Sequence, residues 1–222
     1  MAITILVTAF GSFPGARANP TIAILRALER DWGRAFARAG FELRTAALPV
    51  LYEGAEARVQ ALISQMRPHV VLHLGLAARR PGLSFEACAR NRLSVLHPDA
   101  VGARSGRMVL APQGPMVRRA RAPLARVLAA MASSGAACAL SRDAGDYLCN
   151  QTFYASLATA APCVGFLHIP RPRNLARPLA KARLRPNRAP TLPQTCTATA
   201  KAMWVLARYF SSLNTVFLLP KS

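Results

Sequence analysis

The chain has 222 residues and a formal net charge of +20, from 29 lysine and arginine residues against 9 aspartate and glutamate residues. Hydrophobic residues make up 52% of the sequence, which is enough for a buried core and excludes an intrinsically disordered protein. No apolar stretch approaches the roughly 18 uninterrupted residues of a membrane span, and the N-terminal run MAITILVTAFGSF has no basic segment before it. We therefore expect a first strand instead of a signal peptide, and a protein of the reducing cytoplasm.

Strand-like apolar runs alternate with helical patterns along the chain. The predicted elements, in chain order, are strand 3–10, helix 20–39, strand 41–50, helix 53–66, strand 70–77, a strand-compatible stretch 86–96, a loop 97–120, helix 122–134, strand 136–143, helix 149–161, strand 163–169, a basic proline-rich loop 170–193 and helix 194–213. Asn19 and Pro20 are a good N-cap and first residue for the first helix. This alternation predicts a single α/β domain over residues 1–222, a three-layer α/β/α sandwich with an open, mostly parallel twisted sheet. Active sites of such sheets lie at the carboxyl ends of the strands.

The cysteines and histidines do not form a metal-binding pattern. The five cysteines are scattered and contain no C-x-x-C, which argues against a zinc site or a disulfide scaffold and suits a reducing compartment. His69 and His73 are four residues apart, but they lie in a predicted strand, which spreads them too far to chelate one ion. We expect no metal and no cofactor.

One cysteine has the setting of a nucleophile. Cys149 lies in AGDYLCNQTFYASL (144–157), after a turn at Gly145 and at the start of a helix, where the helix dipole favours a thiolate. His168 ends the buried strand 163–169 at the same rim of the sheet, where it can take the thiol proton and return it to a leaving amine.

A third group, an acid, is needed to orient the imidazole. Glu86, Asp146 and Asp99 are the candidates, and spacing alone does not choose among them. In so basic a chain the acid is expected to be paired with an arginine, for which Arg79 and Arg90 are candidates.

Four segments together carry a resemblance to a known family: ILVTAFGSFPGARANPT, LGLAARRPGLSFEACARN, AGDYLCNQTFYASL and GFLHIPRPR. In this order they resemble type I pyroglutamyl peptidase (pyrrolidone-carboxylate peptidase), a family of cysteine exopeptidases. The resemblance implies that Cys149 is the nucleophile, His168 the base and Glu86 the orienting acid. It also implies the reaction, which is hydrolysis of the amide bond after an N-terminal pyroglutamyl (5-oxoproline) residue of peptides, without a cofactor.

The resemblance extends to substrate binding and assembly. It implies an aromatic wall from Phe10, Phe13 and Tyr147, backbone contacts from Gly75 and Leu76, and a binding-site position for Asn19. Many family members have glutamine where this chain has Leu76. The family commonly forms homo-oligomers, so we expect a dimer or tetramer, with the apolar segment MWVLARYF of the last helix contributing to the contact.

Asp146 would oppose thiolate formation at Cys149 if its side chain pointed toward the sulfur. The oxyanion donors are expected among backbone N–H groups near Cys149 and in the loops at Gly11 or Leu76.

Two alternative functions remain. A cysteine amidase for another small lactam or acyl group is one. The other is a nucleic-acid-binding protein with this fold, suggested by the +20 charge. The arginines are spread over every segment without aromatic interleaving, which favours a solvated surface.

Overall fold

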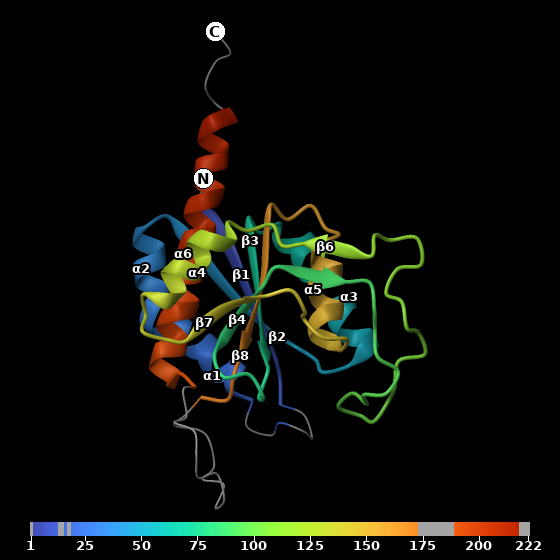
Figure 1. The fold of residues 1–222 in the computed structure, drawn as a ribbon. Helices are drawn as coiled ribbons and strands as arrows, with labels where there is room; N and C mark the ends of the chain where they lie inside the picture. The colour runs from blue at the N-terminus through green and yellow to red at the C-terminus, as the bar shows by residue number, and fades with distance from the viewer. Residues whose placement is uncertain (1, 13–15, 17–18, 173–188, 218–222) are drawn as a thin grey trace, which may run out of the picture.

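The computed structural model describes residues 2–12, 16, 19–172 and 189–217, and its architecture is a sheet between two layers of helices (Figure 1). Within these residues a six-stranded sheet has the order β2-β1-β3-β8-β4-β7. The strands are, in chain order, β1 (Ile3–Phe10), β2 (Phe41–Leu48), β3 (Val70–Leu76), β4 (Leu83–Glu86), β7 (Cys138–Ser141) and β8 (Cys163–Ile169). The predicted α/β fold class is confirmed.

The strand β4 breaks the parallel arrangement. β2, β1, β3 and β8 are parallel to one another, whereas β4 is antiparallel to β8 and parallel to β7. Parallel strands need a crossover of a dozen or more residues. The segment 77–82 between β3 and β4 is too short for one, so the chain turns back on itself.

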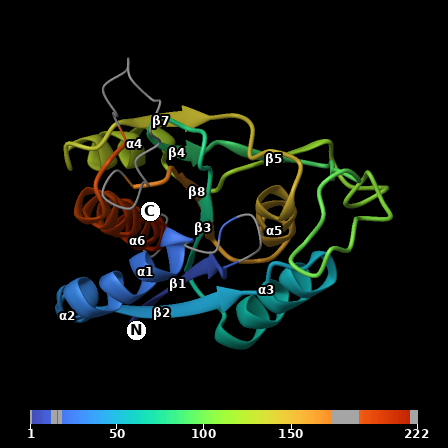
Figure 2. The same ribbon diagram turned by 90° about the horizontal axis from the view of Figure 1, so that it is seen from below.

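The helices divide between the two faces of the sheet (Figure 2). One face is covered by α1 (Pro20–Ala27), α4 (Leu124–Ala132) and α6 (Leu192–Phe217), and the other by α3 (Tyr52–Met66) and α5 (Leu148–Ser156). The predicted helix 20–39 is realised as α1, a π-helical segment (Leu28–Trp32) and α2 (Gly33–Arg38). Asn19 caps α1 as expected, since its side chain accepts a hydrogen bond from the Thr21 N–H.

Alternation along the strands decides which residues can form a site. In β8, Cys163 and Leu167 pack into the core on the α1/α6 face, whereas Val164 and Phe166 pack into the core on the α3/α5 face. Because side chains of a strand alternate with a period of two, His168 belongs to the α3/α5 face. By the same rule Phe10, Gly75 and Glu86 occupy this face of β1, β3 and β4. The face that carries α5 is therefore the one that collects the predicted site residues.

Two expectations need correction. Residues 86–96 do not form one strand, because β4 ends at Glu86 and the chain enters a separate two-stranded ribbon of β5 (Cys88–Arg90) and β6 (Val117–Arg119). β6 lies within the stretch predicted as a loop. In the segment MWVLARYF (203–210), Met203, Leu206 and Phe210 are buried in the core of this chain, whereas Trp204, Val205 and Tyr209 are only partly buried, so its part in a contact between chains stays a prediction.

Most of the predicted basic loop 170–193 lies outside the described residues, which omit 173–188. Among the helices that the structure does describe, none combines the length and the apolar character needed to cross a membrane.

Candidate active site

Cys149 is the second residue of α5, and two local features hold the start of this helix. Gly145 has a φ of 85°, in the left-handed region that favours glycine, and makes the turn that leads into the helix. Asn150, fully buried, fastens the helix to the β5 ribbon. Its Oδ1 accepts from the Arg90 N–H at 2.9 Å, and its Nδ2 donates to the carbonyls of Arg90 at 2.8 Å and Arg92 at 2.9 Å. The residue next to the candidate nucleophile is thus an anchor.

The Cys149 sulfur lies directly against β3 at Gly75. A Cβ atom placed on Gly75 would be 2.8 Å from Cys149 Sγ, which is closer than real Cβ contacts allow. Gly75 is in turn the register partner of His168 on the neighbouring strand β8. The absence of a side chain at Gly75 therefore makes the room in which the thiol sits, beside the strand position of the histidine.

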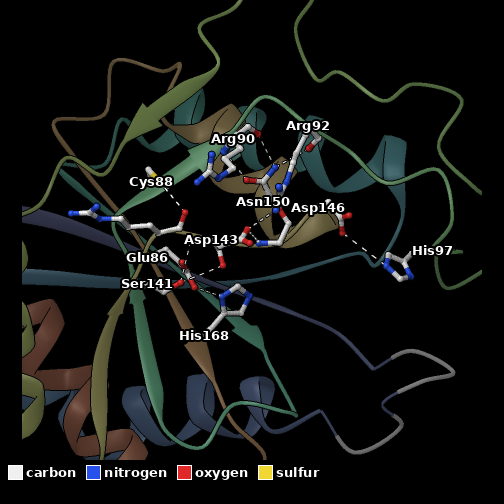
Figure 3. A network of polar contacts seen from close by, with 12 residues as sticks. Glu86, Cys88, Arg90, Arg92, His97, Ser141, Asp143, Asp146, Asn150 and His168 are labelled. Atoms are coloured by element: carbon white, nitrogen blue, oxygen red, sulfur yellow. Dashed lines mark hydrogen bonds and ion pairs between the residues drawn. The ribbon is translucent and has the colours of Figure 1, made fainter.

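His168 and Glu86 form a buried pair (Figure 3). The distance from His168 Nδ1 to Glu86 Oε1 is 2.7 Å, and the two side chains are 5% and 0% exposed. The same Oε1 accepts from Arg80 Nη1 at 2.6 Å. A carboxylate bound to Nδ1 leaves Nε2 as the ring nitrogen that can exchange a proton with a substrate or thiol.

The other two candidate acids point elsewhere. Asp146 is directed toward His97, 3.9 Å away, and both side chains are largely exposed (Figure 3). Asp99 is used within its own loop, where its Oδ1 accepts from the N–H groups of Val101 and Ala103, both at 3.0 Å. Of the three acids, Glu86 alone contacts the histidine. The arginine that pairs with it is Arg80, and neither Arg79 nor Arg90 as expected.

The protonation of Cys149 differs from the expectation. Burial raises the pKa of Cys149 to about 12, and the nearby Glu86 carboxylate raises it further, while Arg80 acts in the opposite direction. The direction is opposite to that of the ready thiolate predicted from the helix start. Burial likewise lowers the pKa of His168, against the opposing effect of the hydrogen bond that Glu86 accepts from it. At neutral pH the site therefore holds a thiol and a neutral imidazole.

A small cavity of about 50 Å³ opens beside the sulfur. Four of the predicted binding residues line it, namely Phe10, Asn19, Leu76 and Tyr147. The rest of the lining comes from Val50, Leu148 and Cys149 itself. The Tyr147 hydroxyl donates to the Pro98 carbonyl at 2.9 Å, which fixes the ring at the mouth of α5. Phe13, also predicted here, lies outside the described residues.

Asn19 borders this cavity, but its polar atoms are committed to the protein. Its Nδ2 donates to the carbonyls of Phe10 and Gly11 at 3.0 Å each, and its Oδ1 accepts from the Thr21 N–H at 3.1 Å and hydroxyl at 2.8 Å. Asn19 thus ties the start of α1 to the end of β1. The Gly11 N–H is also engaged, since it donates to the Leu48 carbonyl at 3.1 Å. The Gly11 N–H itself is therefore not a free oxyanion donor, while residues 13–15 and 17–18 of that loop lie outside the described residues.

The N–H groups at the start of α5 are better placed for that role. The first N–H groups of a helix have no partner within it, and Tyr147 provides no side-chain cap to them. Those of Leu148 and Cys149 lie at the nucleophile itself, where they can stabilise negative charge on a carbonyl oxygen.

The histidine pair that the sequence raised as a metal question has other roles. His73 is fully buried between the Thr8 and Ser156 hydroxyls, at 2.6 and 2.8 Å, and burial lowers its pKa to about 3. His69 Nδ1 accepts from the Thr4 N–H at 3.0 Å. In the part of the chain that the structure describes, no three His, Cys, Asp or Glu side chains are grouped so as to share a metal ion.

Sequence reasoning missed two residues of the site, Arg80 and Asn150. The sequence position of Asn150 could have predicted its role, because a polar residue next to a nucleophile at a helix start can anchor that helix through buried hydrogen bonds. For Arg80 the chain contains many arginines and nothing local distinguishes this one.

Comparison with known proteins agrees with this geometry. The family model for pyroglutamyl peptidase matches residues 3–183. A pyrrolidone-carboxylate peptidase of Pseudomonas fluorescens is 31% identical over 169 residues, which cover 75% of this chain and 78% of that protein. The crystal structure of pyrrolidone carboxyl peptidase from Thermus thermophilus is 36% identical with a TM-score of 0.78, covering 90% of this chain and 99% of the other. That of Thermococcus litoralis, 23% identical with a TM-score of 0.83 and covering 95% and 96%, shows the same fold. The chain therefore belongs to the pyroglutamyl peptidase family, a family of cysteine peptidases.

Proposed function

We propose that the protein is a cysteine exopeptidase that hydrolyses the amide bond after an N-terminal pyroglutamyl residue of peptides, with Cys149 as nucleophile, His168 as base and Glu86 as orienting acid. The observation that carries this proposal is the buried His168–Glu86 pair, joined at 2.7 Å, at the strand position next to the pocket that Gly75 leaves for the Cys149 sulfur.

The protonation states set the order of events. Because the thiol pKa is about 12 and the imidazole is neutral, the proton leaves Cys149 for His168 as the sulfur attacks the carbonyl carbon. Glu86 stabilises the imidazolium, and N–H groups at the start of α5 stabilise the oxyanion. His168 then gives the proton to the leaving amine. Water, with His168 again as base, hydrolyses the thioester and releases 5-oxoproline.

The pocket beside the sulfur suits an uncharged lactam. Its walls are mainly apolar, from Phe10, Val50, Leu76 and Leu148, and none of the described residues that line it is an acid or a base. A five-membered lactam has a polar amide edge and no charged amine, so a pocket with apolar walls and a few hydrogen-bonding groups can bind it. A substrate with a free N-terminal ammonium would enter this pocket only after losing its hydration without a compensating partner.

The test is hydrolysis of a fluorogenic pyroglutamyl amide by the reduced protein, beside Cys149→Ser and a matched control, Cys138→Ser. Cys138 is a partly buried thiol on β7. We expect turnover in the wild type and in the control, and none above background in Cys149→Ser. A folded, reduced wild type that hydrolyses a proline or other acyl amide but no pyroglutamyl amide would instead support the amidase alternative. Salt-dependent binding of random RNA, unchanged in Cys149→Ser and without any hydrolysis, would support the nucleic-acid alternative.

We further propose that the protein self-associates as a dimer or tetramer in the reducing cytoplasm. All five cysteines are free thiols, which suits that compartment.

The self-association is suggested by the segment between β5 and β6, which exposes large apolar side chains that a lone molecule would leave in water, namely Leu96, Val101, Met108 and Met116. The molar mass by light scattering should exceed that of one chain, and Val101→Ser together with Met108→Ser should lower it. A monomer at all concentrations would contradict this.

A further inference from the structure

Arg80 is an unassigned charged residue that reaches the centre of the candidate site. It lies in the turn after β3, where its N–H donates to the Ala77 carbonyl at 2.9 Å. Its guanidinium makes two contacts with different parts of the chain. Nη1 binds Glu86 Oε1 at 2.6 Å, and Nη2 donates to the Asp143 carbonyl, in the segment before α5, at 2.7 Å.

The contact with Arg80 gives the buried Glu86 carboxylate a positively charged hydrogen-bond partner. Glu86 is completely buried, and its Oε2 has no hydrogen-bond partner among the described residues, so Oε1 alone carries the contacts to both Arg80 and His168. Removing a carboxylate from water is costly unless it is paired and hydrogen-bonded. Apart from the histidine that it has to orient, Arg80 supplies the only ion pair that Glu86 makes within the described chain.

We propose that Arg80 is a positioning residue of the reaction: one nitrogen of its guanidinium pairs with Glu86 and holds Oε1 on His168 Nδ1, while its second nitrogen ties this pair to the segment that leads into α5. This inference rests on the proposed function of Cys149, His168 and Glu86. It goes beyond it by assigning a role to a fourth side chain, which acts through Glu86 and does not itself touch the reacting atoms.

The charges around His168 give the direction of the effect. Burial is the main cause of the lowered pKa of His168, and the charge of Arg80 lowers it further. Glu86 from β4 and Asp143 from the segment before α5 act in the opposite direction. Arg80 also works against the burial and the Glu86 charge that raise the pKa of Cys149. Without the guanidinium, both pKa values rise. The neutral imidazole then becomes available only at higher pH, and the thiol is harder to ionise.

The chain offers a matched control in the preceding residue. Arg79 is also an arginine of this turn, but it is exposed, and the described structure gives its side chain no hydrogen bond or ion pair. Arg79→Gln removes the same charge from the same loop without touching Glu86. Arg80→Lys retains the charge but loses the second arm of the guanidinium fork.

The experiment measures kcat/KM against pH for the wild type, Arg80→Gln, Arg80→Lys and Arg79→Gln, with folding checked by circular dichroism and urea unfolding. We expect Arg80→Gln to lose on the order of 10²-fold in kcat/KM, with the acid limb moved to higher pH. Arg80→Lys should restore the pH of the acid limb more completely than it restores kcat/KM. Arg79→Gln should match the wild type in both. In a Glu86→Gln background, Arg80→Gln should cost far less than it does alone, because its effect passes through the carboxylate.

Two results would overturn the proposal. One is an acid limb in Arg80→Gln at the same pH as in Arg79→Gln. The other is a loss that adds in full to that of Glu86→Gln. Alkylation of Cys149 by iodoacetamide, followed by peptide mass spectrometry, keeps the test independent of the substrate. At a fixed pH its rate should fall in Arg80→Gln and not in Arg79→Gln. If the wild type hydrolyses no pyroglutamyl amide, the proposed reaction fails, and the alkylation rates still decide the role of Arg80.

Discussion

Replacing Gly75 by alanine should damage catalysis through one added methyl group. The new Cβ would lie 2.8 Å from Cys149 Sγ and 2.8 Å from two ring carbons of Phe166. Favourable contacts between such atoms lie near 3.5–4.0 Å, so the sulfur and the ring would have to retreat by about 0.7–1.2 Å. Phe166 is fully buried and has little room, which leaves the sulfur as the group that moves.

Two quantities follow from this clash. Overpacking of a core by a methyl group costs about 1–3 kcal/mol of unfolding free energy. A displacement of about 1 Å at a reacting atom costs on the order of 10²-fold in rate. Gly75→Ala should therefore lose both stability and kcat/KM, and the second loss should exceed anything that the first explains.

Gly165→Ala separates the two effects. A Cβ on this β8 glycine would lie 2.5 Å from Phe85 Cζ, so the variant also overpacks the core, but its nearest contacts do not include the Cys149 sulfur. Urea unfolding and hydrolysis of a pyroglutamyl amide, measured on both variants, give the comparison. We expect similar losses of stability and a loss of kcat/KM confined to Gly75→Ala. A Gly75→Ala enzyme with wild-type kcat/KM, or a Gly165→Ala enzyme equally impaired while folded, would refute the reasoning.

Three further predictions concern the charges and the loop around the site. Glu86→Gln should lower kcat by up to about 10⁴-fold through loss of the imidazole orientation, whereas Asp146→Asn should leave it nearly unchanged; equal losses in both would show that the wrong acid has been chosen. Asn19→Ala should cost about 0.5–2 kcal/mol for the cap and raise KM more than it lowers kcat, and an unchanged KM would contradict its role in tying α1 to β1. Because the pKa of His73 in the folded protein, about 3, lies below its ordinary 6.5, its contribution to stability is complete above pH 6.5 and is lost as the pH falls toward 3. The loss amounts to about 5 kcal/mol at most, and urea unfolding from pH 7 to 3 should be less steeply pH-dependent in His73→Gln than in the wild type.

Much of this protein follows from sequence patterns that act over short distances. Alternation of apolar runs predicts the α/β fold, because a strand or a helix must bury one face whatever its neighbours are. Within β8, the two-residue alternation of side chains assigns His168 to the same face as Val164 and Phe166. A glycine turn followed by a helix start identifies Cys149, since Gly145 needs a φ of 85° that other residues rarely adopt. The order of the family motifs then predicts the reaction.

Contacts between distant residues decided the rest. Glu86 and His168 are 82 residues apart, and Asn150 and Arg90 are 60 apart, so nothing in their local sequence selects these partners over others. Residue spacing left Glu86, Asp146 and Asp99 open and only the family resemblance favoured Glu86, whereas the pairing of Glu86 with Arg80 and the antiparallel direction of β4 required the assembled sheet. The thiol pKa did as well. A helix start by itself favours the thiolate, but burial and the charge of Glu86 raise the pKa of the thiol, and both exist only once the strands and α5 have packed together.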